Sequence, residues 1–154
     1  MKNPFILLLL LTFISCGDEE EEVLIASLSL TRFPQKWELV MMTGSLQDSQ
    51  TRGDKMAWQE NYIFYADGAF KKTRERNNEV KEASGTYSIS EQENNSNHIL
   101  YHLVYNRENG LIGSCSGKPE EYLHLDLESQ TLLSDWQICD GPGLYYEQVT
   151  IEKE

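Results

Sequence analysis

The sequence is short of positive charge, of histidine and of proline. Its 154 residues carry 25 acidic against 13 basic side chains, a formal net charge of −12. A nucleic-acid partner is therefore not expected, because binding phosphate groups requires basic side chains that displace their counterions. Four prolines and ten glycines are too few for a fibrous or wholly disordered chain. The length suits one folded domain.

The longest apolar run covers residues 5–14 and follows Lys2. It would span roughly 15 Å as a helix, half the hydrocarbon core of a bilayer, which predicts a signal peptide rather than a membrane-spanning helix. The Ser15-Cys16 pair at its end resembles a bacterial lipobox, in which the cysteine is acylated and becomes the new N-terminus. This resemblance implies a signal peptide over 1–15 and a lipid on Cys16. The alternative is an ordinary secretory signal in which Cys16 is incidental.

Five consecutive carboxylates follow at residues 18–22. They repel each other and anionic lipid, which predicts an extended, solvated tether over 16–33. An acidic run after an acylated cysteine resembles the surface-export signal of lipoproteins from Bacteroidota-type bacteria; a merely solvating linker is the alternative. Both interpretations leave the chain attached to a membrane by its lipid. The expected location is the outer membrane, and the export signal would expose the chain at the cell surface.

The remaining chain, 34–154, shows no sustained helical periodicity and is expected to form a single domain. Short segments rich in Tyr, Val, Ile, Leu, Thr and Trp recur instead, bounded by Gly, Asn, Asp or Pro, which predicts an all-β fold. The expected strands are 36–42, 56–65, 69–76, 82–90, 98–106, 120–127, 131–138 and 144–152, with a short piece at 111–115 and polar loops at 43–55 and 91–97. Eight strands at regular spacing indicate a sandwich or an antiparallel up-and-down barrel.

The first hairpin with a predictable register surrounds Gly68. A three-residue loop with Gly68 in the left-handed region sets Phe64 opposite Phe70 and Glu60 opposite Arg74. Aromatic pairs and opposite charges at facing positions stabilise a sheet, whereas a two-residue loop would place two glutamates opposite each other. The three-residue loop is therefore the prediction.

The second hairpin joins 120–127 to 131–138. A turn at residues 129–130 puts Leu127 across from Leu132 and Leu123 across from Trp136. One face of this hairpin is then mostly apolar and the other polar, as in an antiparallel sheet with one wet face.

The three cysteines are expected to serve two purposes. With Cys16 assigned to lipid, Cys115 and Cys139 remain as a pair in an oxidising compartment. The second hairpin brings Cys139 to one end of the sheet, and a turn at 116–119 returns Cys115 to the same end, which predicts a disulfide. The alternatives are two free thiols or a metal pair, for which no further ligand has suitable spacing.

Four short motifs resemble the lipocalin-like lipoproteins of the same bacteria, and the resemblance covers roughly residues 36–152. The motifs are Lys36-Trp37-Glu38-Leu39, Phe64-Tyr65-Ala66-Asp67-Gly68-Ala69-Phe70, Ser84-Gly85-Thr86-Tyr87 and Cys139-Asp140-Gly141-Pro142-Gly143-Leu144-Tyr145-Tyr146. This family implies an eight-stranded up-and-down barrel or half-open calyx, with Trp37 packed under its closed end. Gln35 stands where lipocalins have a glycine.

Catalytic and metal-binding signatures are missing from the sequence. It contains no Gly-x-Ser-x-Gly, HExxH, P-loop or CxxC pattern. His98 and His102 would lie roughly 13 Å apart on a strand, too far to share one ion, and with His124 they are expected on the solvated surface. We therefore expect no catalysis, no cofactor and no metal.

The basic stretch 71–76 is the most informative remaining feature. If its strand turns these cations toward the barrel interior, they and nearby rings would suit a small apolar or amphipathic ligand. The candidate ligand contacts are Trp58, Tyr62, Phe70, Lys72 and Arg74. The preferred expectation is that this side faces water, because buried cations need partners. Two functions follow: a ligand-binding barrel, or a packed barrel that acts as a structural or protein-interaction module.

Overall fold

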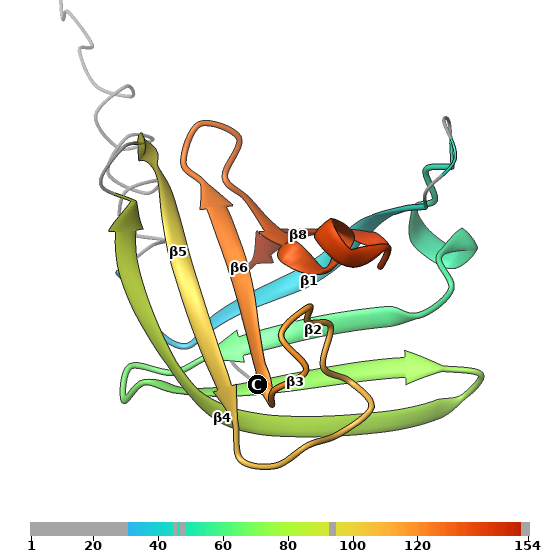
Figure 1. The fold of residues 1–154 in the computed structure, drawn as a ribbon, viewed down its shortest axis with the longest axis horizontal. Helices are drawn as coiled ribbons and strands as arrows, with labels where there is room; N and C mark the ends of the chain where they lie inside the picture. The colour runs from blue at the N-terminus through green and yellow to red at the C-terminus, as the bar shows by residue number, and fades with distance from the viewer. Residues whose placement is uncertain (1–30, 45, 47–48, 93–94, 152–154) are drawn as a thin grey trace, which may run out of the picture. The chain divides into compact units, whose positions relative to one another are not determined.

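The computed structural model describes residues 31–44, 46, 49–92 and 95–151. They form an all-β closed barrel in which each strand pairs with the next in the chain and the last pairs with the first (Figure 1). The strands are β1 (Gln35–Thr43), β2 (Gln59–Phe64), β3 (Ala69–Arg76), β4 (Glu79–Gln92), β5 (Asn95–Tyr105), β6 (Glu120–Asp126), β7 (Thr131–Ser134) and β8 (Gly143–Val149). Two short 3₁₀ helices, η1 (Gly53–Lys55) and η2 (Asp135–Cys139), lie in the connections.

The predicted antiparallel up-and-down meander is confirmed. Because successive strands alternate in direction, one end of the barrel collects η1, η2 and the β5–β6 loop at residues 106–119. We call this end the mouth. Figure 1 shows η2 beside β8 and the β5–β6 loop, in gold and orange, crossing β2 and β3 in this view.

Side chains alternate between the two faces of each strand, and those that point inward fill the barrel interior. Residues of one phase point inward, and most of them are aromatic or leucine. The ring of Phe64 lies 4.8 Å from that of Tyr87 and 5.2 Å from that of Tyr101, between centroids. Trp37 is almost completely buried, as the lipocalin resemblance implies, and its indole N–H donates to the side chain of the buried Gln35.

The predicted register of the β2–β3 hairpin is confirmed. Phe64 pairs with Phe70 and Glu60 with Arg74. Gly68 has φ 82°, in the left-handed region that glycine adopts without steric cost. The Asp67 carboxylate accepts a hydrogen bond from the backbone N–H of Ala69 and so shapes the turn.

The predicted register of the β6–β7 hairpin is wrong by two residues. Leu125, not Leu127, pairs with Leu132, and Leu123 pairs with Ser134 rather than with Trp136. The Asp126 carboxylate accepts hydrogen bonds from the N–H groups of the second and third following residues, which builds a longer loop. A shift of two residues leaves every side chain on its predicted face.

The strand predicted over 131–138 ends at Ser134. The hydroxyl of Ser134 accepts a hydrogen bond from the backbone N–H of Trp136 and begins η2. Asp140, in the left-handed conformation, ends it. The short strand predicted at 111–115 is also wrong, because these residues lie in the β5–β6 loop.

Two further boundaries differ from expectation at the opposite end of the barrel. The expected loop 91–97 is largely strand, since β4 runs to Gln92 and β5 begins at Asn95. Residues 88–91 are all exposed. Polar residues are compatible with strand there because the side chains of this part of β4 face solvent.

The signal peptide over 1–15, the lipid on Cys16 and the acidic tether as far as residue 30 lie outside the described residues. Within the described ranges, no helix has the length and apolar character needed to cross a membrane.

Candidate functional site

The five candidate ligand contacts belong to the inner face of β2 and β3 or to the residue just before β2. Tyr62, Phe70 and Lys72 are completely buried, Arg74 is largely buried, and Trp58 is half-buried. The expectation that this side faces water is wrong. The barrel supplies the partners that buried cations need. The predicted hairpin register already set Glu60 opposite Arg74, whereas Glu121 as a partner of Lys72 was not expected.

Lys72 is held by three groups from three elements. Its ammonium Nζ lies 2.8 Å from Glu121 Oε1 on β6 and 3.2 Å from Glu60 Oε1 on β2. It also donates a 2.8 Å hydrogen bond to the backbone carbonyl of Leu111 in the β5–β6 loop. An ammonium has three donors, so these contacts match its capacity.

Arg74 completes the charge balance. Its Nε donates to Glu60 Oε2, and its Nη2 donates to the same Leu111 carbonyl at 3.3 Å. Two carboxylates, Glu60 and Glu121, thus face two cations inside the barrel, and the formal charges cancel. Burying these ions is tolerable because each is paired and hydrogen-bonded.

The carboxylates also accept hydrogen bonds from three buried tyrosines. Tyr62 donates to Glu121 Oε2 at 2.7 Å, Tyr105 donates to the same oxygen, and Tyr146 donates to Glu60 Oε1 at 2.6 Å. We call these three tyrosines, with Glu60, Lys72, Arg74 and Glu121, the polar cluster. Its side chains come from β2, β3, β5, β6 and β8, so it links most of the barrel wall.

Burial raises the pKa of several tyrosines. The pKa values of Tyr62, Tyr105 and Tyr146 lie well above 10 because burial disfavours the phenolate and the neighbouring carboxylates repel it. Burial, with a smaller contribution from Tyr87, raises the pKa of Tyr101 to about 12.

We expect stability to fall steeply in alkaline solution. An unfolded tyrosine loses its proton near pH 10, whereas these four keep theirs in the folded state, so their contribution is complete below about pH 10 and is lost as pH rises toward the folded pKa. Each tyrosine that stays protonated should lower the free energy of unfolding by about 1.4 kcal/mol per pH unit above that point. Urea unfolding at several pH values between about 9 and 11.5 measures the slope, and Tyr101→Phe should reduce it. Full titration of all eight tyrosines near pH 10 in folded protein, followed by tyrosinate absorbance, would contradict this expectation.

The β5–β6 loop closes the mouth over the polar cluster. Leu111 is 3 % exposed, and the backbone N–H of Gly113 donates to Glu121 Oε1. The Trp136 indole of η2 packs so closely on this loop that a Cβ at Gly113 would lie 2.7 Å from it. Leu111 and Gly113 of this loop are therefore part of the barrel interior, whereas its two ends lie at the surface.

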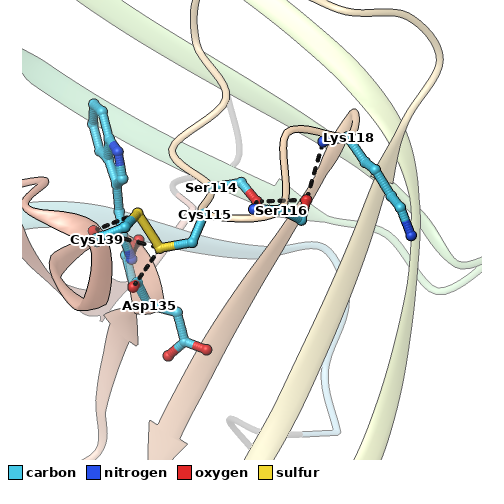
Figure 2. Close-up of a disulfide and its surroundings, with 8 residues drawn as sticks. Ser114, Cys115, Ser116, Lys118, Asp135 and Cys139 are labelled. Atoms are coloured by element: carbon cyan, nitrogen blue, oxygen red, sulfur yellow. Dashed lines mark hydrogen bonds between the residues drawn. A yellow bond between two sulfur atoms is a disulfide. The ribbon is translucent and has the colours of Figure 1, made fainter.

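The predicted disulfide is present. Cys115 in the β5–β6 loop is joined to Cys139 at the end of η2, with their Cα atoms 5.6 Å apart. Figure 2 shows this bond linking the two segments, with the Asp135 carboxylate pointing away from it. Both cysteines are exposed. The disulfide pins the loop to η2 across the mouth.

Trp58 forms the outer layer of the mouth. The guanidinium of Arg74 lies 4.5 Å from its ring centroid and that of Arg76 lies 5.7 Å away, both within cation–π range. The Trp136 ring lies 6.5 Å from it, between centroids. Its indole Nε1 is buried without a hydrogen-bond partner among the described residues.

Glu121 and Leu111 were not expected at the site, and Glu60 was expected only as the cross-strand partner of Arg74. A signal for the two glutamates exists in the strand phase: Glu60 lies two residues before Tyr62, and Glu121 two residues before Leu123, so both share the inward phase. Leu111 has no such signal, because its position depends on how an irregular loop folds.

The three histidines lie on the outer face, as expected, although each is half-buried. His102 stacks on Tyr122 with ring centroids 4.6 Å apart. His124 Nε2 lies 2.7 Å from Asp135 Oδ1. A groove of about 530 Å³ on this face is lined by His98, His124, Asp126, Leu133, Ser134, Asp135, Gln137 and Ile138.

Asp126 of the groove accepts hydrogen bonds from two backbone N–H groups. Hydrogen bonds from the backbone N–H of Ser129 and then of Glu128 lower its pKa, and His98 opposite it adds to the effect. Among the residues that the structure describes, no three histidine, cysteine or acidic side chains are placed to hold a metal ion together.

Comparisons with known proteins give no match for this chain, neither to a protein-family model nor to a curated protein nor to a solved structure. The resemblance to lipocalin-like lipoproteins therefore depends on the four short motifs. At the level of architecture, the eight-stranded antiparallel up-and-down barrel, with its buried aromatic cluster, is consistent with a calycin-like fold.

Proposed function

We propose that this chain is a non-catalytic, lipid-anchored protein of the bacterial cell envelope whose barrel is filled by its own side chains. It acts through its outer surface, as a structural or protein-interaction module. The observation that carries this proposal is the polar cluster: both interior cations already have carboxylate partners and a backbone carbonyl. An amphipathic anion entering here would have to displace those partners.

Large buried side chains support the same function. Outside the polar cluster, aromatic rings of β2 and β5 are in contact inside the barrel, as between Phe64 and Tyr101 with centroids 5.2 Å apart. A ligand-holding calyx needs unfilled apolar volume of a few hundred Å³. The outer face instead offers a groove with two carboxylates, Asp126 and Asp135, beside Ile138, which is 79 % exposed.

An envelope location is supported by two features. The lipobox-like Ser15-Cys16 pair and the acidic run after it imply acylation and attachment to the outer membrane, with exposure at the cell surface. The disulfide between Cys115 and Cys139 suits an oxidising compartment. Metabolic labelling with an alkyne fatty acid, compared between the wild type and Cys16→Ala, tests the anchor directly.

Binding of a fluorescent fatty-acid probe tests whether the barrel is filled. We expect no saturable binding by the oxidised wild-type protein, since the two described interior cations, Lys72 and Arg74, already have carboxylate partners and the interior is occupied. A fatty-acid-binding protein of similar size, titrated in parallel, serves as the positive control. One-to-one binding that an unlabelled fatty acid reverses would support the ligand-binding alternative, with Trp58, Tyr62, Phe70, Lys72 and Arg74 as its contacts.

A further inference from the structure

We propose that the β5–β6 loop is a displaceable occupant of a binding site at the mouth, and that the ligand of this site is a short neutral amphiphile carrying a carbonyl group. This proposal goes beyond the filled barrel described above, because it concerns the barrel after the loop has moved. The site consists of Lys72, Arg74 and the space that Leu111 now takes.

Leu111 is bound as an amphipathic ligand would be. Its carbonyl oxygen accepts hydrogen bonds from Lys72 Nζ at 2.8 Å and Arg74 Nη2 at 3.3 Å, and its apolar side chain is buried. Two cations therefore converge on one oxygen that belongs to an irregular loop and not to the barrel wall. Any molecule that places a carbonyl oxygen at this point and an apolar group beside it can replace the loop.

The charge of the polar cluster decides the class of ligand. The charges of Lys72 and Arg74 are balanced by Glu60 and Glu121, so the two cations offer hydrogen bonds without a net positive charge. An entering carboxylate would add an unbalanced negative charge beside two buried glutamates, which is costly in a dry interior. An amide or ester carbonyl reproduces the group that is bound now. The site thus favours a neutral acyl amide or ester over a fatty acid.

The loop is attached to the barrel by few groups. Among the described backbone atoms, no backbone-to-backbone hydrogen bond joins residues 107–117 to a strand. Its inner contacts are the Leu111 carbonyl, the buried Leu111 side chain and the N–H of Gly113, on which the Trp136 indole packs. Its outer attachment is the disulfide between Cys115 and Cys139. A segment with so few backbone bonds opens at lower free energy than the strands. The disulfide then sets the fraction of molecules in which the loop is displaced.

Probe displacement in disulfide-free protein tests the proposal. Nile red, a neutral dye with a carbonyl group, is titrated into the oxidised wild type and into Cys115→Ser/Cys139→Ser. The apparent dissociation constant is the intrinsic one divided by the open fraction, so we expect binding at least about tenfold tighter without the disulfide. Octanamide should displace the dye and octanoate, of equal chain length, should not. Glu108→Gln, which alters an exposed residue of the same loop and keeps the disulfide, is the matched control and should behave as the wild type.

A second variant and a second measurement guard against a disulfide-free protein that does not fold. Leu111→Ala, with the disulfide intact, removes the apolar anchor of the loop and should also tighten Nile red binding. In amide NMR spectra of the folded variants, octanamide should shift the signals of Gly113 and of the Trp58 indole. Shifts confined to the outer groove would contradict the proposal.

The Nile red titrations have four further possible outcomes, and each either supports or contradicts a stated part of the proposal. Absence of saturable Nile red binding in both folded variants overturns the site, and equal displacement by octanoate overturns its preference for neutral ligands. Binding by the oxidised wild type as tight as by the variants contradicts the occupying role of the loop and, separately, the filled barrel of the proposed function. Tighter binding by the variants alone supports the proposal and leaves that function intact.

Discussion

Replacing Lys72 by methionine should lower the free energy of unfolding by about 3–5 kcal/mol, because it leaves buried charge without its partner. Methionine fills a similar volume, so the loss reflects charge rather than a cavity. In the variant, Glu60 keeps Arg74, whereas Glu121 loses its cation and the Leu111 carbonyl loses one of its two donors. Urea unfolding followed by tryptophan fluorescence, without reductant, measures the change.

A second substitution separates charge from packing. Lys72→Met/Glu121→Gln removes one carboxylate together with the cation, so the remaining Glu60 and Arg74 are balanced, and it should recover part of the lost stability. Lys81→Met removes a cation that pairs with Glu79 on the surface and should change stability by less than about 0.5 kcal/mol. Equal effects of Lys72→Met and Lys81→Met would show that the buried pairs contribute little.

Removing the disulfide should produce an effect of similar size. Cys115 and Cys139 are 24 residues apart in sequence. In the chain-entropy model a closed loop of that length stabilises the fold by about 3.5 kcal/mol, since the cross-link restricts the unfolded chain. Cys115→Ser/Cys139→Ser should therefore unfold at a lower urea concentration, while far-UV circular dichroism still reports β structure.

The reduced wild type provides the matched control for this variant. Both lack the cross-link, so their unfolding curves should coincide if the serines introduce no other change. An oxidised protein no more stable than the reduced one would contradict the expected contribution of the disulfide. It would also indicate that the unfolded chain already holds the β5–β6 loop near η2.

The hairpins show which parts of the fold the sequence could predict. The register at Gly68 was predictable because one residue type, glycine in the left-handed region, determines the turn. The β6–β7 register was not, because the Asp126 side chain builds a loop that a two-residue turn at 129–130 does not describe. Alternation of apolar side chains remained correct in both hairpins, since it depends on the strand phase and not on the turn.

The sequence predicted which residues of β2 and β3 share a face, but it did not predict that this face is buried. Strand phase correctly placed Tyr62, Lys72 and Arg74 on one face. Whether that face is wet or buried depends on partners across the barrel, and Glu121 is 49 residues away from Lys72 in sequence. No periodicity relates residues at that distance. From the sequence alone, a basic strand next to aromatic residues could therefore face either solvent or the barrel interior. Only the closed barrel shows that it faces the interior.

The disulfide prediction was correct although the register used to support it was not. The disulfide requires Cys115 and Cys139 to reach the same end of the barrel, and strand direction alone ensures that. The conversion of the last predicted strand residues into η2 brings Cys139 toward the β5–β6 loop. Ser134 as the N-terminal cap was the local signal for that helix.

Because β7 is short, its pairing with β8 is the shortest backbone ladder between described strands of the barrel. β7 pairs with β8 from Thr131 to Leu133, whereas β3 pairs with β4 along its whole length. Local separation of neighbouring strands should start at the shortest ladder, because fewer backbone hydrogen bonds must break together there. Local opening should therefore cost less free energy around β7 than around β3 and β4. A strand of another protein that pairs through its backbone would therefore add first between β7 and β8.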